Sequence, residues 1–261
     1  MNRRNFLSLS GAAGLAAITT STSTVSAADG SARDFYQLMQ FQVDSPEQKK
    51  QVDGFLKEAA IPALNRMGMK PVGVFYPAEG LSPVYALLRF SSLNDVGMLN
   101  VRLAQDREFT SAASDFLGAP ASAPAFKRME SSVMIAFEGM PKLETPVLSP
   151  GRVFQLRIYE SPSVVTGLKK IEMFNDAGEI KIFRKTGLNP VFFGQTIIGT
   201  KMPNLTYMLA FKSMEEQKEA WKKFVSHPDW KSISGMPEYA DKAILSNITN
   251  LPLIAAEYSQ I

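Results

Sequence analysis

The sequence predicts an α+β fold: two tandem ferredoxin-like βαββαβ domains packed sheet to sheet as an intramolecular dimeric α/β barrel. Three observations support this prediction. A Gly-apolar-polar-Pro-Val motif occurs twice, at residues 68–72 and 187–191. Strand-type and helix-type patterns follow one another in the same order around both motifs. A single domain of this kind leaves one face of its sheet uncovered, and a second copy in the same chain can cover it.

Each copy begins with a strand and a helix. Apolar and polar residues alternate over residues 35–41 and 153–159, and both segments carry Gln-Leu at the same positions. The stretch after each strand has apolar residues at steps of three and four, as an amphipathic helix does. Gly68 and Gly187 suit the left-handed position that ends a helix, and the proline three residues later prevents the helix from continuing.

The second part of each copy repeats as well. A strand follows each motif, and a further strand is predicted over residues 84–90 and 205–211. Ser92 and Ser213 then begin a second helix, each with an acidic residue three positions later, as in a capping box. The last strand of the first copy, within residues 132–141, is matched to residues 243–252. The first copy alone has an Ala/Pro-rich insertion at residues 118–126, which predicts a surface loop.

The repeat also gives the domain boundaries: a first domain at 33–141, a linker at 142–151 and a second domain at 152–261. Residues 1–28 are interpreted as a signal peptide, because a paired arginine, a short apolar run and a small-x-Ala site follow one another there. The pattern resembles a twin-arginine signal, although Asn2 and Ser8 depart from it and Sec export stays open. We expect a periplasmic or otherwise exported protein with no membrane span.

The composition excludes several classes of site. The chain has 261 residues, is 45% hydrophobic and lacks cysteine, so it has no disulfides, thiolate nucleophiles or cysteine-bound metals. A single histidine, His227, rules out histidine-rich metal cages. Without Arg3 and Arg4 of the signal, the chain has 26 basic and 25 acidic residues, and the net charge falls from +3 to +1. This balance gives no electrostatic reason to bind nucleic acid.

Alternation along the strands predicts which side chains line the space between the sheets. Within residues 153–159, one apolar face is assigned to the helices, so that Gln155, Arg157 and Tyr159 face the other sheet. The equivalent residues of the first copy, which are therefore also expected to face the other sheet, are Gln37, Met39 and Phe41. Because an unpaired charge is costly under helices, Arg89 is assigned to the inter-sheet face together with Tyr85 and Leu87. The second-copy counterparts of these three are Thr206, Met208 and Ala210, which leaves Tyr207 toward the helices.

The predicted ligand-binding residues are therefore Gln37, Tyr85, Arg89, Gln155, Arg157 and Tyr159. A guanidinium group in an apolar cavity favours a carboxylate or similar planar anion. The alternative interpretation is structural: Arg157 pairs with a buried carboxylate such as Glu160 or Glu257 and holds the sheets together.

Other chemistry-bearing residues have local explanations. His227 precedes Pro228 and is expected to cap a helix. Trp221 and Trp230 are expected in the core, and Asp176 and Glu179 on a solvated helix face. Phosphate-binding, zinc-protease and serine-hydrolase motifs are missing from the sequence. No catalytic residue, metal site or cofactor is therefore predicted.

The second copy resembles the NIPSNAP family. The resemblance covers roughly 100 residues and rests on LRIYE at 156–160, IFRKTGLNPV at 182–191, IIG at 197–199, LTYMLAF at 205–211 and DWK at 229–231. At residues 207–211 the sequence YMLAF departs from a His-Leu-Trp strand of many members. The resemblance implies a dimeric α+β-barrel fold but no common reaction. Related barrels include cofactor-free monooxygenases, haem-binding enzymes and small-molecule isomerases.

These observations leave open whether the protein is an enzyme. We expect an exported binding protein that holds a small, partly apolar ligand between its two sheets. The alternative is an oxidoreductase of the cofactor-free monooxygenase or haem-binding barrel type, in which His227 is the only histidine that could ligate haem. A third hypothesis is a homo-oligomer that assembles through strand edges or outer helices.

Overall fold

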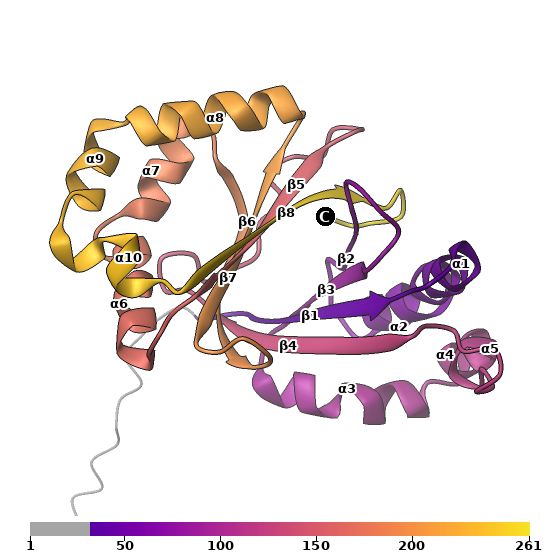
Figure 1. Ribbon diagram of the computed structural model, residues 1–261. Helices are drawn as coiled ribbons and strands as arrows, with labels where there is room; N and C mark the ends of the chain where they lie inside the picture. The colour runs from indigo at the N-terminus through magenta and orange to yellow at the C-terminus, as the bar shows by residue number, and fades with distance from the viewer. Residues whose placement is uncertain (1–31) are drawn as a thin grey trace, which may run out of the picture. The chain divides into compact units, whose positions relative to one another are not determined.

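Eight antiparallel strands of the computed structural model close into one barrel, in the order β1-β3-β2-β8-β5-β7-β6-β4 (Figure 1). The structure describes residues 32–261, so the predicted signal peptide lies outside the described residues. The strands are β1 (Phe35–Gln42), β2 (Gly73–Pro77), β3 (Val84–Phe90), β4 (Arg128–Ala136), β5 (Val153–Glu160), β6 (Asn189–Ile198), β7 (Asn204–Phe211) and β8 (Asn247–Ala255).

Each half of the chain supplies four neighbouring strands of the barrel. The orders are β4-β1-β3-β2 in the first half and β6-β7-β5-β8 in the second, as in the split βαβ motif. The halves join where β2 pairs with β8 and where β4 pairs with β6. The predicted fold class is therefore confirmed, and pairing at both edges makes the two sheets one closed barrel.

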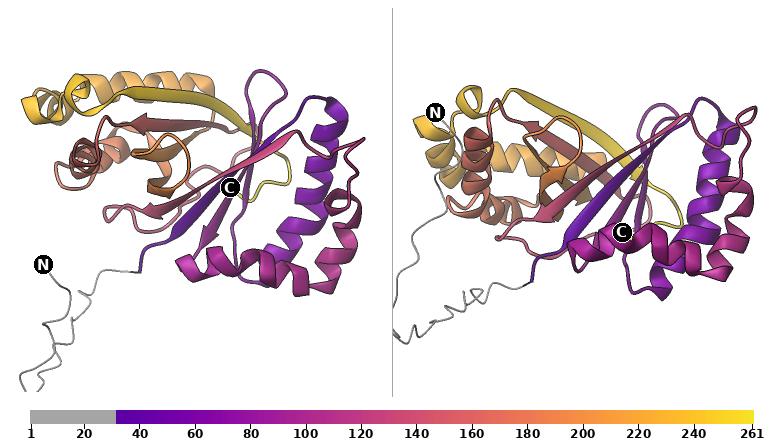
Figure 2. Two further views of the ribbon diagram at one scale, coloured as in Figure 1. Left: turned by 60° about the horizontal axis from the view of Figure 1, so that its bottom comes forward. Right: turned by 90° about the horizontal axis from the view of Figure 1, so that it is seen from below.

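Helices cover the outer surface of each half, at opposite sides of the barrel (Figure 2). The first half has α1 (Pro46–Gly54), the π-helical η1 (Phe55–Ala60), α2 (Ile61–Arg66), α3 (Leu93–Gln105), α4 (Arg107–Ala112) and α5 (Ser114–Leu117). The second half has α6 (Val164–Asn175), α7 (Glu179–Thr186), α8 (Met214–Ser226), α9 (Pro228–Ser234), the 3₁₀ turn η2 (Pro237–Tyr239) and α10 (Asp241–Ile244). Within residues 32–261, no helix has both the length and the apolar character to cross a bilayer.

The helix boundaries follow the signals in the sequence. Ser92 and Ser213 cap α3 and α8 by accepting a hydrogen bond from the N–H group three residues later. Gly68 and Gly187 end the helices that precede β2 and β6, with φ angles of 76° and 85° in the left-handed region. His227 caps α9, because its Nδ1 accepts the N–H of Asp229 at 3.2 Å. The predicted caps are thus confirmed.

Three apolar clusters hold the molecule together. The first and second clusters lie between the sheet and the helices, one in each half of the chain. The third cluster fills the barrel interior. The buried members of the third cluster are Tyr36, Leu38, Phe75, Tyr85, Leu87, Met134, Ala136, Val147, Phe154, Leu156, Val191, Phe192, Met208, Ala210, Leu253 and Ile261. The space between the two sheets is therefore largely occupied by the protein's own side chains.

The last strands of the two halves correspond differently from the sequence-based match. Ile135 of β4 lies opposite Phe35, and Ile254 of β8 lies opposite Val153 at the equivalent position of β5. Residues 132–141 therefore correspond to 251–260 and not to 243–252. The prediction was wrong because it treated residues 118–126 as an insertion without a counterpart, whereas η2 and α10 occupy a comparable length before β8.

Candidate functional site

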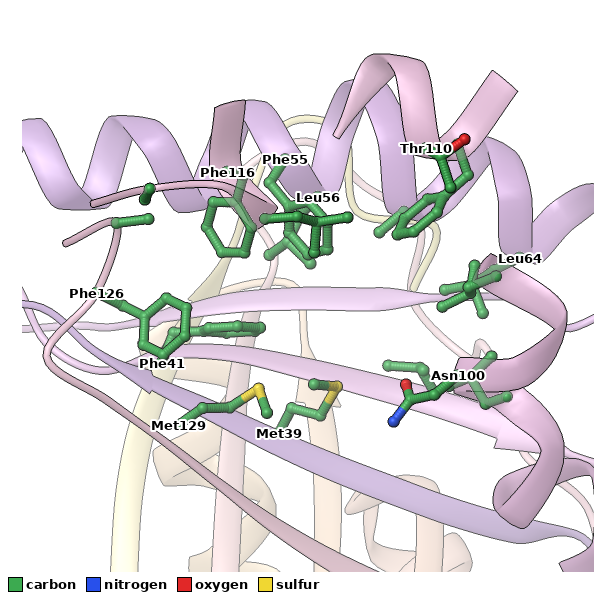
Figure 3. A pocket seen from close by; sticks show the side chains of 18 of the residues that line it. Met39, Phe41, Phe55, Leu56, Leu64, Asn100, Thr110, Phe116, Phe126 and Met129 are labelled. Atoms are coloured by element: carbon green, nitrogen blue, oxygen red, sulfur yellow. The ribbon is translucent and has the colours of Figure 1, made fainter. Parts of the chain in front are cut away.

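A cavity of about 680 Å³ lies between the sheet and the helices of the first half (Figure 3). None of its lining side chains is ionisable. Most are aliphatic or aromatic, and the polar exceptions are Asn100 and Thr110. The lining residues are Met39, Phe41, Phe55, Leu56, Ala60, Leu64, Val72, Leu88, Leu99, Asn100, Leu103, Ala104, Phe109, Thr110, Phe116, Leu117, Ala119, Pro124, Ala125, Phe126 and Met129.

The insertion of the first half forms one wall of this cavity. Phe126 packs edge-on against Phe41 of β1, with ring centroids 5.7 Å apart. Phe116 of α5 stacks on Phe55 of η1, with centroids 4.0 Å apart and planes within 6°. Ala125 is only 3% exposed. The segment at 118–126, predicted as a surface loop, is a loop, but it also encloses apolar space.

The second half fills the equivalent space with large side chains. Helices α3 and α8 have the same length and equivalent caps, so Asn100 corresponds to Trp221 and Leu103 to Phe224. In the second half, Trp221 and Phe224 pack edge-on with centroids 5.5 Å apart, and Trp230 lies 4.4 Å from Phe224. Both tryptophans thus pack against the core, as predicted. The first half has smaller residues at two of these positions, which leaves room for the cavity.

The predicted inter-sheet positions of Gln37, Gln155, Arg157 and Tyr159 are wrong. Phe154 and Leu156 of β5 fill the barrel interior, whereas Tyr159 packs in the helix-side cluster of the second half. In β1, Tyr36 and Leu38 likewise face the interior, and Met39 and Phe41 face the helices. Both strands carry apolar residues on both faces, so alternation alone did not determine which face is which. The predicted inter-sheet positions of Tyr85 and Leu87 are confirmed, and so is the predicted helix-side position of Tyr207.

Arg157 is tolerated under the helices because aromatic rings surround it. Its guanidinium carbon lies 4.9 Å from the Trp221 ring centroid and 5.2 Å from that of Tyr159. Gln155 accepts a hydrogen bond from the Trp221 indole N–H at 2.7 Å. Within residues 32–261, no carboxylate lies within 4.0 Å of Arg157, so the alternative pairing with Glu160 or Glu257 is wrong too.

Beside Arg157 lies a buried ion pair that the sequence did not reveal. Lys170 Nζ is 3.5 Å from Glu179 Oε2, and these residues are 1% and 2% exposed. The hydroxyls of Tyr159 and Tyr207 are 3.0 Å apart. Burial raises the pKa of Glu179 to about 7, although Lys170 acts in the opposite direction. The expected solvated face is therefore wrong for Glu179, while Asp176 is exposed as predicted.

A smaller cavity of about 280 Å³ lies at one end of the barrel. Tyr85 lines it together with Lys201, Glu130 and Asn204. Burial raises the pKa of the Tyr85 phenol to about 12. Asn204 holds the turn beside the cavity by donating to the carbonyls of Thr200 and Lys201. A ligand-binding role for Tyr85 stays a prediction.

Arg89 is occupied by an internal contact. Its guanidinium donates to Asp34 at 2.7 Å, and Asp34 also accepts bonds from Lys142 and from the N–H of Leu143. Burial alone would raise the pKa of Asp34, but these hydrogen bonds outweigh burial and lower it. Arg89 therefore ties β3 to the linker between the halves, which gives it a structural role.

The residues present do not fit a histidine-ligated haem. His227 lines neither cavity, and its Nδ1 is engaged at the start of α9. Metal-binding clusters of three or more His, Cys, Asp or Glu side chains are also missing from the described part of the chain. The two cavities therefore remain the candidate sites, and the larger one is the better suited to an apolar molecule.

Sequence reasoning missed the residues of this cavity because each resembles an ordinary core position. The one available signal was a difference between the copies: the first half has an asparagine, Asn100, at the position where the second half has Trp221.

Comparison with solved structures supports the fold. A candidate monooxygenase from Lactobacillus acidophilus superposes with a TM-score of 0.56 at 12% identity, over 85% of this chain and 94% of that chain. A second candidate monooxygenase, from Fusobacterium nucleatum, gives 0.56 at 8% identity, over 86% and 93%. An anthrone oxidase-like protein gives 0.52 at 10% identity, over 87% and 93%. At these identities, the likeness concerns the fold.

Comparison with curated proteins finds no significant match. Residues 154–260 match the model of the NIPSNAP family. This segment runs from β5 to the residues that follow β8. The second half of the barrel is thus similar to the NIPSNAP family.

Proposed function

We propose that the protein binds a small, mainly apolar molecule in the first-half cavity. The observation that carries this proposal is an open space of about 680 Å³ with no ionisable lining residue. Pockets for small molecules are commonly of this size and mainly apolar. The sequence-based expectation of a partly apolar ligand is kept, but its expected place between the sheets is filled by side chains.

The contrast between the two halves supports the proposal. The same helix-and-sheet unit fills this space with Trp221 and Phe224 in the second half. The fold therefore does not itself require the cavity. A side chain that fills apolar space stabilises a core, so an unfilled space in one copy is consistent with a functional demand there.

The geometry favours binding over catalysis. Proton transfer requires an acid or base within hydrogen-bonding reach, and the lining side chains include neither a carboxyl nor an imidazole nor an amine. An oxidoreductase of the cofactor-free monooxygenase type is the second candidate, because candidate monooxygenases share the fold over most of their length. Dioxygen uptake with a bound aromatic ligand would establish this second function.

Titration with diphenylhexatriene, an uncharged hydrocarbon that fluoresces in apolar surroundings, tests the binding proposal. We expect saturable binding at one site per chain. Asn100→Trp introduces the residue that the second half already carries at the equivalent position, and it should weaken binding at least about tenfold by filling the cavity. Val101→Trp is the matched control, because Val101 is 47% exposed on the same helix. Equal affinities of both variants would refute the site.

We further propose that the protein is exported through its amino-terminal segment. The support is the twin-arginine pattern of the sequence at residues 3–7 followed by a small-x-Ala site. Fractionation of expressing cells tests this proposal: mature protein should be found in the periplasm, and Arg3→Lys with Arg4→Lys should leave precursor in the cytoplasm. Unchanged export of that variant would favour the Sec route.

A further inference from the structure

Asn100 lines the first-half cavity and is itself exposed to solvent, so its amide is available to a ligand. Its side chain extends from α3 toward Met39 across the cavity (Figure 3). Within the described part of the chain, this amide makes no hydrogen bond, whereas the hydroxyl of Thr110 donates to the carbonyl of Arg107 at 3.2 Å. Of the two polar side chains in the lining, only Asn100 therefore has both a free donor and a free acceptor.

Within residues 32–261, no basic side chain lines the cavity, and four of those on the surrounding elements pair with carboxylates. Arg66 lies 2.6 Å from Asp106 and 3.0 Å from Glu108, so two carboxylates already neutralise it. At the opposite end, Lys127 pairs with Asp44 at 3.2 Å.

Two further basic residues of these elements are paired as well, and two others are unpaired among the described residues but do not line the cavity. Arg128 lies 3.8 Å from Glu130, and Arg102 lies 2.9 Å from Asp95. Lys57 and Arg107 are exposed to water and do not line the cavity. Between the apolar walls, a carboxylate would lose its hydration without gaining a cationic partner, which disfavours its binding there.

We infer that the ligand is an uncharged molecule with an apolar body and a neutral hydrogen-bonding group, such as a hydroxyl, carbonyl or amide, that contacts Asn100. This inference rests on the proposed function and names the ligand class of the same site. It departs from the expectation of an anionic ligand, because Arg157 lies in the other half. The amide of Asn100 can donate to a carbonyl or accept from a hydroxyl, so it selects for polarity without charge.

Competition against bound diphenylhexatriene tests the ligand class with molecules of one chain length. At about pH 8, where the acid is ionised, 1-decanol and decanamide should displace the probe at concentrations at least tenfold lower than decanoate or decylammonium do. Decanoate or decylammonium competing as well as decanol would overturn the inference.

The variant Asn100→Leu separates the contact from the cavity. Leucine has nearly the same size but no hydrogen-bonding group, so the affinities for decanol and decanamide, each divided by that for diphenylhexatriene, should fall about three- to tenfold. An unchanged ratio would refute the contact with Asn100. If the probe does not bind, or binds equally after Asn100→Trp, the proposed function itself fails; if it binds but the head groups are not distinguished, only the inference fails.

Discussion

The buried ion pair of the second half allows a quantitative test of how its core is held. Lys170 and Glu179 are 1% and 2% exposed, with Nζ and Oε2 3.5 Å apart. Above about pH 7, where Glu179 is ionised, replacing Lys170 by methionine leaves a buried carboxylate without this cation, which typically lowers the free energy of unfolding by about 3–5 kcal/mol. Lys169→Met is the matched control, because Lys169 is partly exposed and pairs with Glu172 at the surface, where such pairs contribute about 0–1 kcal/mol.

The stability contributed by Glu179 depends on pH. Burial raises its pKa from 4.5 to about 7, against the opposing effect of Lys170. Between these values the unfolded chain has released this proton and the folded chain still holds it, so stability falls as the pH rises through this window. At about 1.4 kcal/mol per pKa unit, the loss amounts to about 3 kcal/mol and is complete above about pH 7. The other charged or titratable groups near Glu179 are Asp241, Arg157, Tyr159 and Tyr207.

Urea denaturation of the unaltered protein and of Glu179→Gln at about pH 5 and pH 8 measures this effect. Glutamine cannot ionise, so the variant should gain about 2–3 kcal/mol relative to the unaltered protein between these two pH values. A difference that does not change with pH would show that the folded protein does not hold Glu179 in its protonated form, and the account of this buried pair would be wrong.

Three further predictions concern the fold. His227→Ala should lower the free energy of unfolding by about 1 kcal/mol through loss of the α9 cap, whereas His227→Asn should retain most of it, as thermal denaturation can measure. Gly187→Ala should cost about 1–2 kcal/mol because its φ is 85°, while Gly54→Ala, in a helix with open space around it, should stabilise the protein; equal effects would contradict the assigned backbone conformations. Asp34→Asn should lower the free energy of unfolding at neutral pH. Because the pKa of Asp34 is lowered in the folded state, the difference in free energy of unfolding between the variant and the unaltered protein should shrink below about pH 4. A difference that stays constant with pH would refute the ion pair with Arg89.

Local signals in the sequence were sufficient for the element order and the fold class. The serines before α3 and α8, the glycines after the first helices and the repeated Pro-Val motif depend on neighbouring residues only. The duplication then implied that the two sheets must cover each other. These helix-start and helix-end signals can be recognised in one sequence because they follow from local backbone geometry.

The phase of β1 and β5 could not be derived in the same way. Both faces of these strands are buried, one by helices and one by the barrel interior, so the alternation of polar and apolar residues has little contrast. Arg157 was assigned to the wrong face because the apolar face of β5, with Phe154 and Leu156, was assigned to the helices. Its position between Trp221 and Tyr159 depends on α8, which follows only at Met214–Ser226.

The candidate site was also beyond reach of the sequence alone. A cavity is space left between elements, and its lining of Leu, Phe and Met residues is indistinguishable from a core until the packing is known. Only the presence of Asn100 at the position equivalent to Trp221 indicated that the two copies differ in packing.

The central claim is that the first-half cavity is a binding site for an apolar molecule, and a crystal structure with a brominated hydrocarbon tests it most directly. Bromine scatters anomalously, so its position can be located without ambiguity. We predict an anomalous peak between β1, η1 and α3, within contact distance of Met39 and Leu103, and its loss in Asn100→Trp. A peak confined to the barrel end beside Tyr85, or full occupancy of the cavity in Asn100→Trp, would contradict the account.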